Sequence, residues 1–132
     1  MGVIMDKLKK ILIVEDEEGI RAFVKAYLES EGFKVLEASH GKEGLEVLSK
    51  EIPDLIISDI MMPVMDGIEF FKELRKIPEA KDVPVIMLTV KDEFSDIKYA
   101  YLLGVEEYIT KPFDPSLLVN RIRQVFTSEK LA

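Results

Sequence analysis

The strongest indication of the fold is the segment Pro53–Gly67, PDLIISDIMMPVMDG. Its apolar run Leu55–Ile57 is typical of a strand buried on both faces, as in a parallel sheet. The run ends on Asp59, a carboxylate that is costly to remove from water at the edge of a core. The segment therefore predicts a buried strand whose carboxyl end presents one acid, followed by a Met-Pro loop.

Apolar runs and helical periodicities alternate on both sides of this strand. Strands are predicted at residues 11–16, 33–38, 54–59, 84–89 and 105–110. Helices are predicted around residues 20–28, and at 41–50, 66–76, 92–103 and 115–127. Strict alternation favours an α/β fold, a single doubly wound five-stranded parallel sheet with helices on both faces. The strand at 33–38 is the more polar one and is expected near an edge.

Composition limits the classes of function. The chain has 132 residues, 48% of them hydrophobic and 33% charged, which suits one folded domain rather than a disordered segment. A net charge of −7 argues against direct binding to nucleic acid or to an anionic membrane. There is no cysteine, so a disulfide framework and a thiolate metal site are excluded and a cytoplasmic location is expected. The predicted organisation is a short extension at 1–9, one domain at 10–127 and a tail at 128–132.

Polar residues gather where the predicted strands end, and ligands bind at that edge of such sheets. These residues are Glu15, Asp16, Asp59, Thr89 and Lys111. Each has an ordinary explanation when taken singly, such as helix capping or a solvated lysine. Together they place three carboxylates side by side, which repel one another unless a cation is present. An all-oxygen set of this kind suits Mg²⁺.

Four segments carry a resemblance to a known family: ILIVEDE, DLIISDIMMPVMDG, VIMLTV and EEYITKPFD. They resemble the signature segments of receiver domains of two-component response regulators, over roughly Lys10–Thr127. The resemblance implies a flavodoxin-like fold with strand order 2-1-3-4-5. It also implies a phosphorylation-operated switch in which Asp59 accepts a phosphoryl group from a sensor histidine kinase or a histidine phosphotransfer protein. Such a domain catalyses only its own phosphorylation and dephosphorylation.

The resemblance assigns the acidic residues to a magnesium site. Asp16 and Asp59 would be direct ligands, and Glu15 would assist through water. The backbone carbonyl of Met61 would be a further ligand. Many relatives have Asp where this chain has Glu15, and a water-bridged contact should tolerate the extra methylene group.

Further roles follow from the same resemblance. Thr89 and Lys111 would bind the phosphoryl oxygens. Tyr108 occupies the position of an aromatic switch residue, whose ring would move when Thr89 moves. The Lys111–Pro112 peptide bond would be cis, a proline-dependent conformation.

The C-terminal part is most similar to receivers of the winged-helix transcription-factor subfamily, which pair through their fourth helix, fifth strand and fifth helix. These are the elements predicted here at 92–103, 105–110 and 115–127, and phosphorylation is expected to change their surface and so control a partner or effector. Glu107 and Arg121 occupy charge positions of that surface, so a weak homodimer on phosphorylation is expected. Leu117 stands where that subfamily usually has an acid, which removes one expected ion pair. The sequence fits either a stand-alone receiver or an excised one.

Three other functions remain open at this stage. A small Mg²⁺-dependent phosphatase or phosphotransferase also uses an Asp nucleophile, but Met61 stands where such enzymes place a second Asp. A flavodoxin-like FMN carrier is disfavoured because the acidic first loop would repel phosphate. A docking module that is never phosphorylated is disfavoured by the intact Asp59, Thr89 and Lys111.

Overall fold

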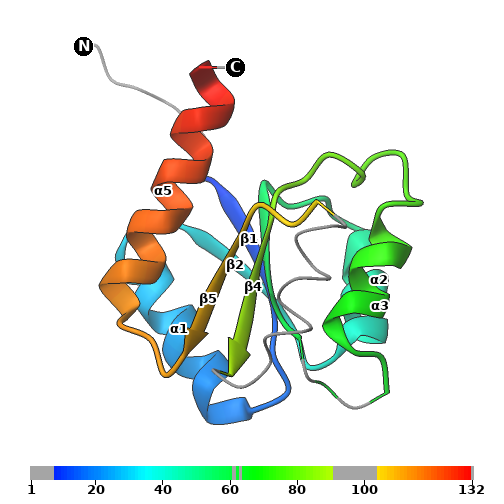
Figure 1. The fold of residues 1–132 in the computed structure, drawn as a ribbon, viewed down its shortest axis with the longest axis horizontal. Helices are drawn as coiled ribbons and strands as arrows, with labels where there is room; N and C mark the ends of the chain where they lie inside the picture. Colours follow the sequence, from blue (N-terminus) through cyan, green and yellow to red (C-terminus); the bar gives the residue numbers. More distant parts are fainter. Residues whose placement is uncertain (1–7, 61, 63, 91–103, 132) are drawn as a thin grey trace.

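Five parallel strands form one sheet in the order β2-β1-β3-β4-β5 in the computed structural model of the chain (Figure 1). The structure describes residues 8–60, 62, 64–90 and 104–131, apart from the side chains of residues 89, 90 and 129–131. The strands are β1 (Lys10–Val14), β2 (Lys34–Ala38), β3 (Leu55–Asp59), β4 (Val85–Val90) and β5 (Glu107–Lys111). The helices are α1 (Glu18–Ser30), α2 (Gly41–Leu48), α3 (Gly67–Leu74) and α5 (Pro115–Leu131). The predicted α/β class and strand order are confirmed, whereas the helix predicted at 92–103 lies outside the described residues.

Strand β3 lies at the centre of the sheet, between β1 and β4. All five of its residues are buried, as the apolar segment predicts for a strand covered on both faces. The more polar β2 forms one edge, and this expectation is also confirmed. The crossovers bring β1 and β3 into register, with Leu12 opposite Ile56 and Val14 opposite Ser58.

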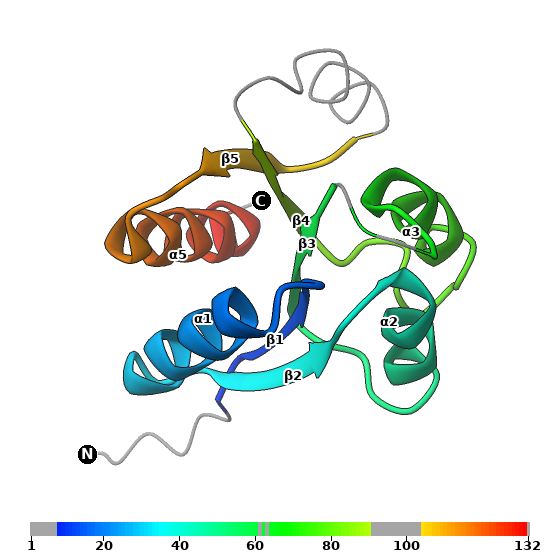
Figure 2. The same cartoon turned by 90° about the horizontal axis from the view of Figure 1, so that it is seen from below.

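Helices cover both faces of the sheet. Figure 2 shows α1 and α5 on one side and α2 and α3 on the other. Neighbouring strand residues point to opposite faces, so each strand supplies both cores. Leu12 and Ile56 belong to the core under α2 and α3, whereas Ile13 and Ile57 belong to the core under α1 and α5.

The element boundaries differ slightly from those predicted. Strand β1 ends at Val14, so the acids that follow it lie in the loop before α1. Strand β5 ends at Lys111 and therefore includes the lysine expected just after it. Helix α5 continues through Leu131, four residues beyond its predicted end. The hydrophobic stripe predicts that a helix exists more reliably than it predicts the residue at which the helix ends.

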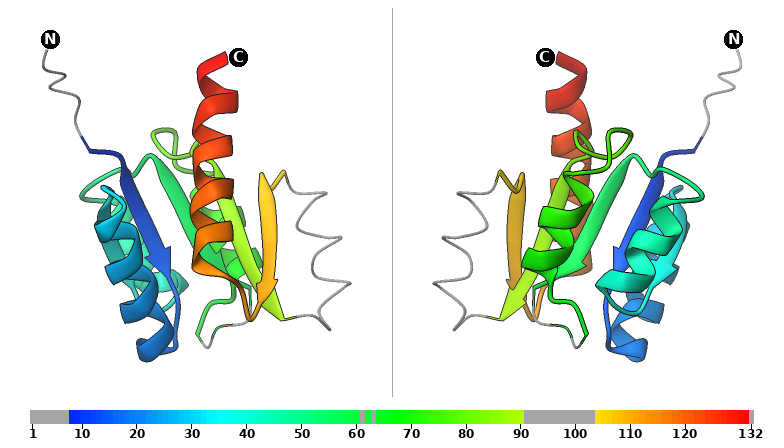
Figure 3. Two further views of the ribbon diagram at one scale, coloured as in Figure 1. Left: turned by 90° about the vertical axis from the view of Figure 1, so that its left-hand side faces the viewer. Right: turned by 90° about the vertical axis from the view of Figure 1, so that its right-hand side faces the viewer.

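The start of β1 and the C-terminal end of α5 lie at the same end of the molecule (Figure 3). Because the strands are parallel, their carboxyl ends lie together at the opposite end. None of the helices in the described part of the chain is both long enough and apolar enough to cross a membrane.

Candidate functional site

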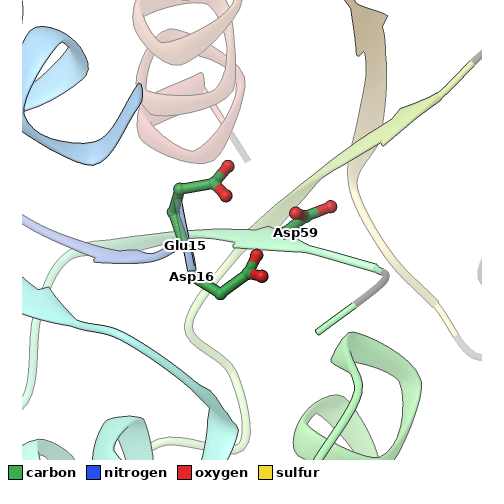
Figure 4. Close-up of side chains that lie close together, drawn as sticks. All are labelled: Glu15, Asp16 and Asp59. Atoms are coloured by element: carbon green, nitrogen blue, oxygen red, sulfur yellow. The ribbon is translucent and has the colours of Figure 1, made fainter. Parts of the chain in front are cut away.

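Three acids meet beyond the carboxyl ends of β1 and β3. Figure 4 shows the side chains of Glu15, Asp16 and Asp59 converging there. One carboxylate oxygen from each of them lies within 4.8 Å of those of the others. Glu15 is 0% and Asp59 6% exposed, whereas Asp16 is exposed. The predicted acidic cluster therefore exists, with two members withdrawn from water and one open to it.

Lys111 brings a positive charge into this cluster from the end of β5. Its Nζ donates to Glu15 Oε1 at 2.8 Å and to Asp59 Oδ2 at 2.9 Å. The lysine side chain is 13% exposed, so both contacts are well shielded from water. Parallel pairing of β4 with both β3 and β5 carries the lysine to the acids, although it is 96 residues from Glu15 in sequence.

Burial and pairing shift the ionisation of two of these groups. Burial raises the pKa of the Glu15 carboxyl, and the hydrogen bond from Lys111 only partly opposes that effect. Burial alone would lower the pKa of Lys111. The hydrogen bonds to Glu15 and Asp59 outweigh this effect of burial, so the pKa of Lys111 is raised above its usual value. The ammonium form of Lys111 is thus the one that the site stabilises.

Every polar group of Glu15 has a partner. Its Oε1 accepts from Lys111, and its Oε2 accepts from the backbone N–H of Glu17 at 3.1 Å. Its own N–H donates to the carbonyl of Ala38 at 3.1 Å. Its carbonyl accepts from Nη1 of Arg21 at 2.7 Å. The loop between β1 and α1 is therefore fixed from several directions, and Arg21 is a participant that the sequence interpretation missed.

Gly67 is the second residue missed. Its N–H donates to the carbonyl of Ile60 at 2.8 Å, which brings the start of α3 against the end of β3. A Cβ atom at this position would overlap the carbonyl oxygen of Asp59. The Asp-Gly pair at 66–67 was the available signal, since glycine often marks a close backbone approach.

Two predicted site positions, Met61 and Thr89, are not fully described, whereas Tyr108 is. Met61 lies outside the described residues, and so does the side chain of Thr89. The backbone of β4 pairs Leu88 with Asp59, which puts Thr89 one residue further toward the site edge. Tyr108 is half-buried and packs against the core under α2 and α3.

The remaining predicted positions lie on β5, directly after it, and on α5. The Lys111–Pro112 peptide bond is cis. Arg121 Nη1 contacts Glu107 Oε2 at 2.6 Å within one molecule. The role of these two charged residues in an interface stays a prediction.

The acidic cluster fits a magnesium ion in the chemistry of its donors. All three candidate side chains offer carboxylate oxygens, the hard ligands that Mg²⁺ prefers. Asp16 is open to solvent, so an ion can reach the cluster while keeping bound water. Lys111 already neutralises part of the charge, which leaves a site of modest net negative charge.

A family model and several curated proteins match this chain in sequence. The family model described as response regulator receiver domain matches residues 11–123. PhoP of Bacillus subtilis, named as an alkaline phosphatase synthesis transcriptional regulatory protein, is 41% identical over 94% of this chain and 51% of its own length. Response regulator SaeR of Staphylococcus aureus is 41% identical over 91% of this chain and 51% of its own length. The chain spans about half the length of these curated relatives.

Solved structures agree with the sequence relatives. The chemotaxis response regulator CheY4 of Vibrio cholerae superposes with a TM-score of 0.85 at 34% identity, covering 90% of this chain and 99% of that one. A CheY-like receiver domain protein from Methanospirillum hungatei gives a TM-score of 0.88 at 31% identity, covering 96% of this chain and 100% of that one. Each of these two alignments covers nearly the whole of this chain and of the solved structure, whereas the alignments with the curated relatives cover about half of the relative.

Proposed function

This chain belongs to the response regulator receiver domain family, and on that premise we propose that Asp59 is its phospho-acceptor. The observation that carries the proposal is the contact of Lys111 with both Asp59 and Glu15, 2.9 and 2.8 Å away. A nucleophilic carboxylate, an ammonium group and two further acids lie together where a phosphoryl group would be transferred. Transfer of this kind depends on positioning and on neutralising charge.

The proposed reaction uses Asp59 as nucleophile. One of its carboxylate oxygens forms a bond to phosphorus while the phosphorus–nitrogen bond of a phosphohistidine breaks, and the electron pair returns to the imidazole. Lys111 offsets the negative charge of the phosphoryl oxygens, and the Thr89 hydroxyl is assigned the same task. The donor is a sensor histidine kinase or a histidine phosphotransfer protein.

Magnesium is part of this proposal. Asp16 and Asp59 would hold the ion directly, Glu15 would act through water, and the Met61 carbonyl would be a further ligand. When bound, the ion would supply positive charge to the phosphoryl oxygens. Glu15 also has a task of its own, because its contact with Lys111 keeps the ammonium group beside Asp59.

The proposed output is a change in the surface formed by the helix predicted at 92–103, β5 and α5, transmitted through Thr89 and Tyr108. PhoP is named as a transcriptional regulator, and this chain matches about half of it. We therefore assign this chain the input role in control of a partner or effector in the cytoplasm, with a weak homodimer on phosphorylation. Glu107 and Arg121 lie on the surface assigned to that contact.

Intact mass measured with Mg²⁺ and acetyl phosphate tests the function. The protein should gain one phosphoryl group, and Asp59→Asn should lose most of that gain. Asp54→Asn is the matched control, because Asp54 lies just before the other end of the same strand and bonds the backbone of Lys10. Equal labelling of Asp59→Asn would refute the assignment. A wild-type protein that never gains mass would instead indicate a docking module.

A further inference from the structure

Arg21, in the first turns of α1, contacts the main chain beside the acidic cluster. Its Nη1 donates to the carbonyl of Glu15 at 2.7 Å, and its side chain is 17% exposed. Helix α1 begins at Glu18, so the contact runs from the helix back to the loop that precedes it. This arginine is assigned no task in the phosphoryl-transfer proposal above.

The Glu15 carbonyl belongs to the same planar peptide unit as the N–H of Asp16. Because that unit is rigid, fixing the carbonyl oxygen also fixes the direction in which the chain enters Asp16. Asp16 is exposed, so packing does not hold its position as it holds Glu15. A hydrogen bond to this carbonyl therefore restricts the position of the Asp16 backbone, and with it the position from which the Asp16 side chain extends.

Glu37 fixes Arg21 in turn. Arg21 Nε lies 3.4 Å from Glu37 Oε1, so the two ends of the guanidinium group join β2 to the loop after β1. Lys25, one helical turn further along α1, contacts the other carboxylate oxygen of Glu37 at 3.1 Å. The two cations share one partner, but of the two only Arg21 contacts Glu15.

We propose that Arg21 is a positioning residue for the cation site, acting through the Glu15–Asp16 peptide with Glu37 as its support. This inference rests on the proposed magnesium site. Residues that orient ligands without touching the ion commonly change metal affinity about 10–100-fold when they are removed. A planar guanidinium group suits the role because it bonds two acceptors at once.

Electrostatics alone predicts the opposite result. Removing the positive charge of Arg21 leaves the acidic cluster more negative, which would strengthen cation binding. Loss of positioning would weaken it. The sign of the change in affinity therefore separates the two effects.

The experiment measures Mn²⁺ binding to the unphosphorylated chain of 132 residues from the amplitude of the free-ion electron paramagnetic resonance signal. Arg21→Met keeps an apolar stem and removes the guanidinium group, and it should weaken binding about tenfold. Lys25→Met is the matched control on the same helix with the same partner. It should leave the affinity unchanged or slightly higher. Arg21→Lys keeps the charge but lacks the planar fork, so it should bind Mn²⁺ more weakly than the wild type and more tightly than Arg21→Met.

The outcomes are separable. Wild-type affinity, or tighter binding, in Arg21→Met would overturn the positioning role while leaving the magnesium site intact. Equal weakening in Lys25→Met would also overturn it, because the effect would then belong to Glu37 or to the helix. Absence of Mn²⁺ binding to the wild type would instead refute the proposed cation site. If urea unfolding shows that Arg21→Met does not fold, Arg21→Lys decides, and wild-type affinity there overturns the inference.

Discussion

Two buried carboxylates of the site depend on one ammonium group. Glu15 and Asp59 are withdrawn from water, and carboxylates of like charge in such a place repel each other. Lys111 contacts both of them at hydrogen-bond distance. Replacing a whole buried ion pair by apolar side chains often changes the free energy of unfolding little. Removing only one partner is strongly destabilising, because the charge that remains is buried without compensation.

Lys111→Met should therefore destabilise the protein by about 3 kcal/mol in the absence of divalent cation. Urea unfolding followed by circular dichroism measures the change. Added Mg²⁺ should recover part of the loss, because a cation that binds only the folded acidic cluster stabilises it. The variant should respond to Mg²⁺ more strongly than the wild type, since its cluster is more negative.

Lys76→Met is the control for that variant. Lys76 contacts Glu73 at 3.0 Å, but the two side chains are 72% and 44% exposed. An exposed pair of this kind contributes about 0–1 kcal/mol, so little change in stability is expected. Similar losses for Lys76→Met and Lys111→Met would contradict the argument from burial.

Val64, near the acceptor, has an unfavourable backbone conformation. Its φ is 71°, in the left-handed region, and its side chain is 75% exposed. The left-handed region is unfavourable for a β-branched residue, and the burial of so exposed a side chain offsets little of that cost. Val64→Asn should stabilise the protein by about 1 kcal/mol, because asparagine tolerates this region. Val64→Thr keeps the branching and should change little in the same urea experiment. A gain with threonine as large as with asparagine would show that polarity, not backbone strain, is responsible.

At the scale of elements, the junction of β3 and α3 fixes the acceptor. Gly67 begins α3 directly against the carbonyl of Asp59, where a side chain does not fit. Gly67→Ala should destabilise the protein by about 3 kcal/mol, because the obstruction is backbone and cannot rotate away. It should also weaken Mn²⁺ binding, since Asp59 must shift.

Gly19→Ala is the matched control in α1. No atom lies within 4 Å of a Cβ built at Gly19, and alanine favours a helix over glycine by about 1 kcal/mol. This variant should therefore be slightly more stable than the wild type in the same measurement. A Gly67→Ala protein as stable as Gly19→Ala would refute the close approach at the acceptor.

The elements in the described part of the chain were predictable from sequence because their local patterns are strong. The apolar run of β3 predicted burial on both faces, and the alternation of patterns predicted a parallel sheet. Contacts between elements left no such pattern. Nothing near Arg21 in sequence indicates that it reaches the carbonyl of Glu15, because that contact depends on the direction in which α1 leaves the loop. His40 makes another contact that no local pattern indicated: it is the N-cap residue of α2, and its Nδ1 accepts from the N–H of Glu43 at 3.2 Å.

At the scale of the molecule, the pattern within each strand predicted that the polar strand ends would meet but did not predict the order of the strands. Parallel pairing alone brings all strand ends to one edge, so Glu15, Asp59 and Lys111 were expected to meet. The order β2-β1-β3-β4-β5 came from the family resemblance, since periodicity within a strand does not specify its neighbours. Packing then decides which ends touch and which only share an edge.

A phosphoryl mimic should change more than the site. With Mg²⁺ and beryllofluoride, we expect amide chemical shifts to change around Asp59 and also along β5 and α5. The physical reason is that Tyr108, in β5, packs against the core under α2 and α3 and borders the strand that carries Thr89. Changes confined to the acceptor loop would contradict a switch through Tyr108. Asp59→Asn treated in the same way is the control.

Because β3 is central in the sheet and β5 is at its edge, we expect the free energy of local opening to be higher at β3 than at β5. Amide hydrogens of a buried central strand exchange with solvent mainly through global opening, whereas an edge strand can open by itself. Asp59 is on the first kind of strand and Lys111 on the second. A partial opening that detaches β5 would withdraw the ammonium group and leave the acceptor in place. We therefore expect the nucleophile and its cation to belong to different units of unfolding, with slow deuterium uptake at β3 beside faster uptake at β5.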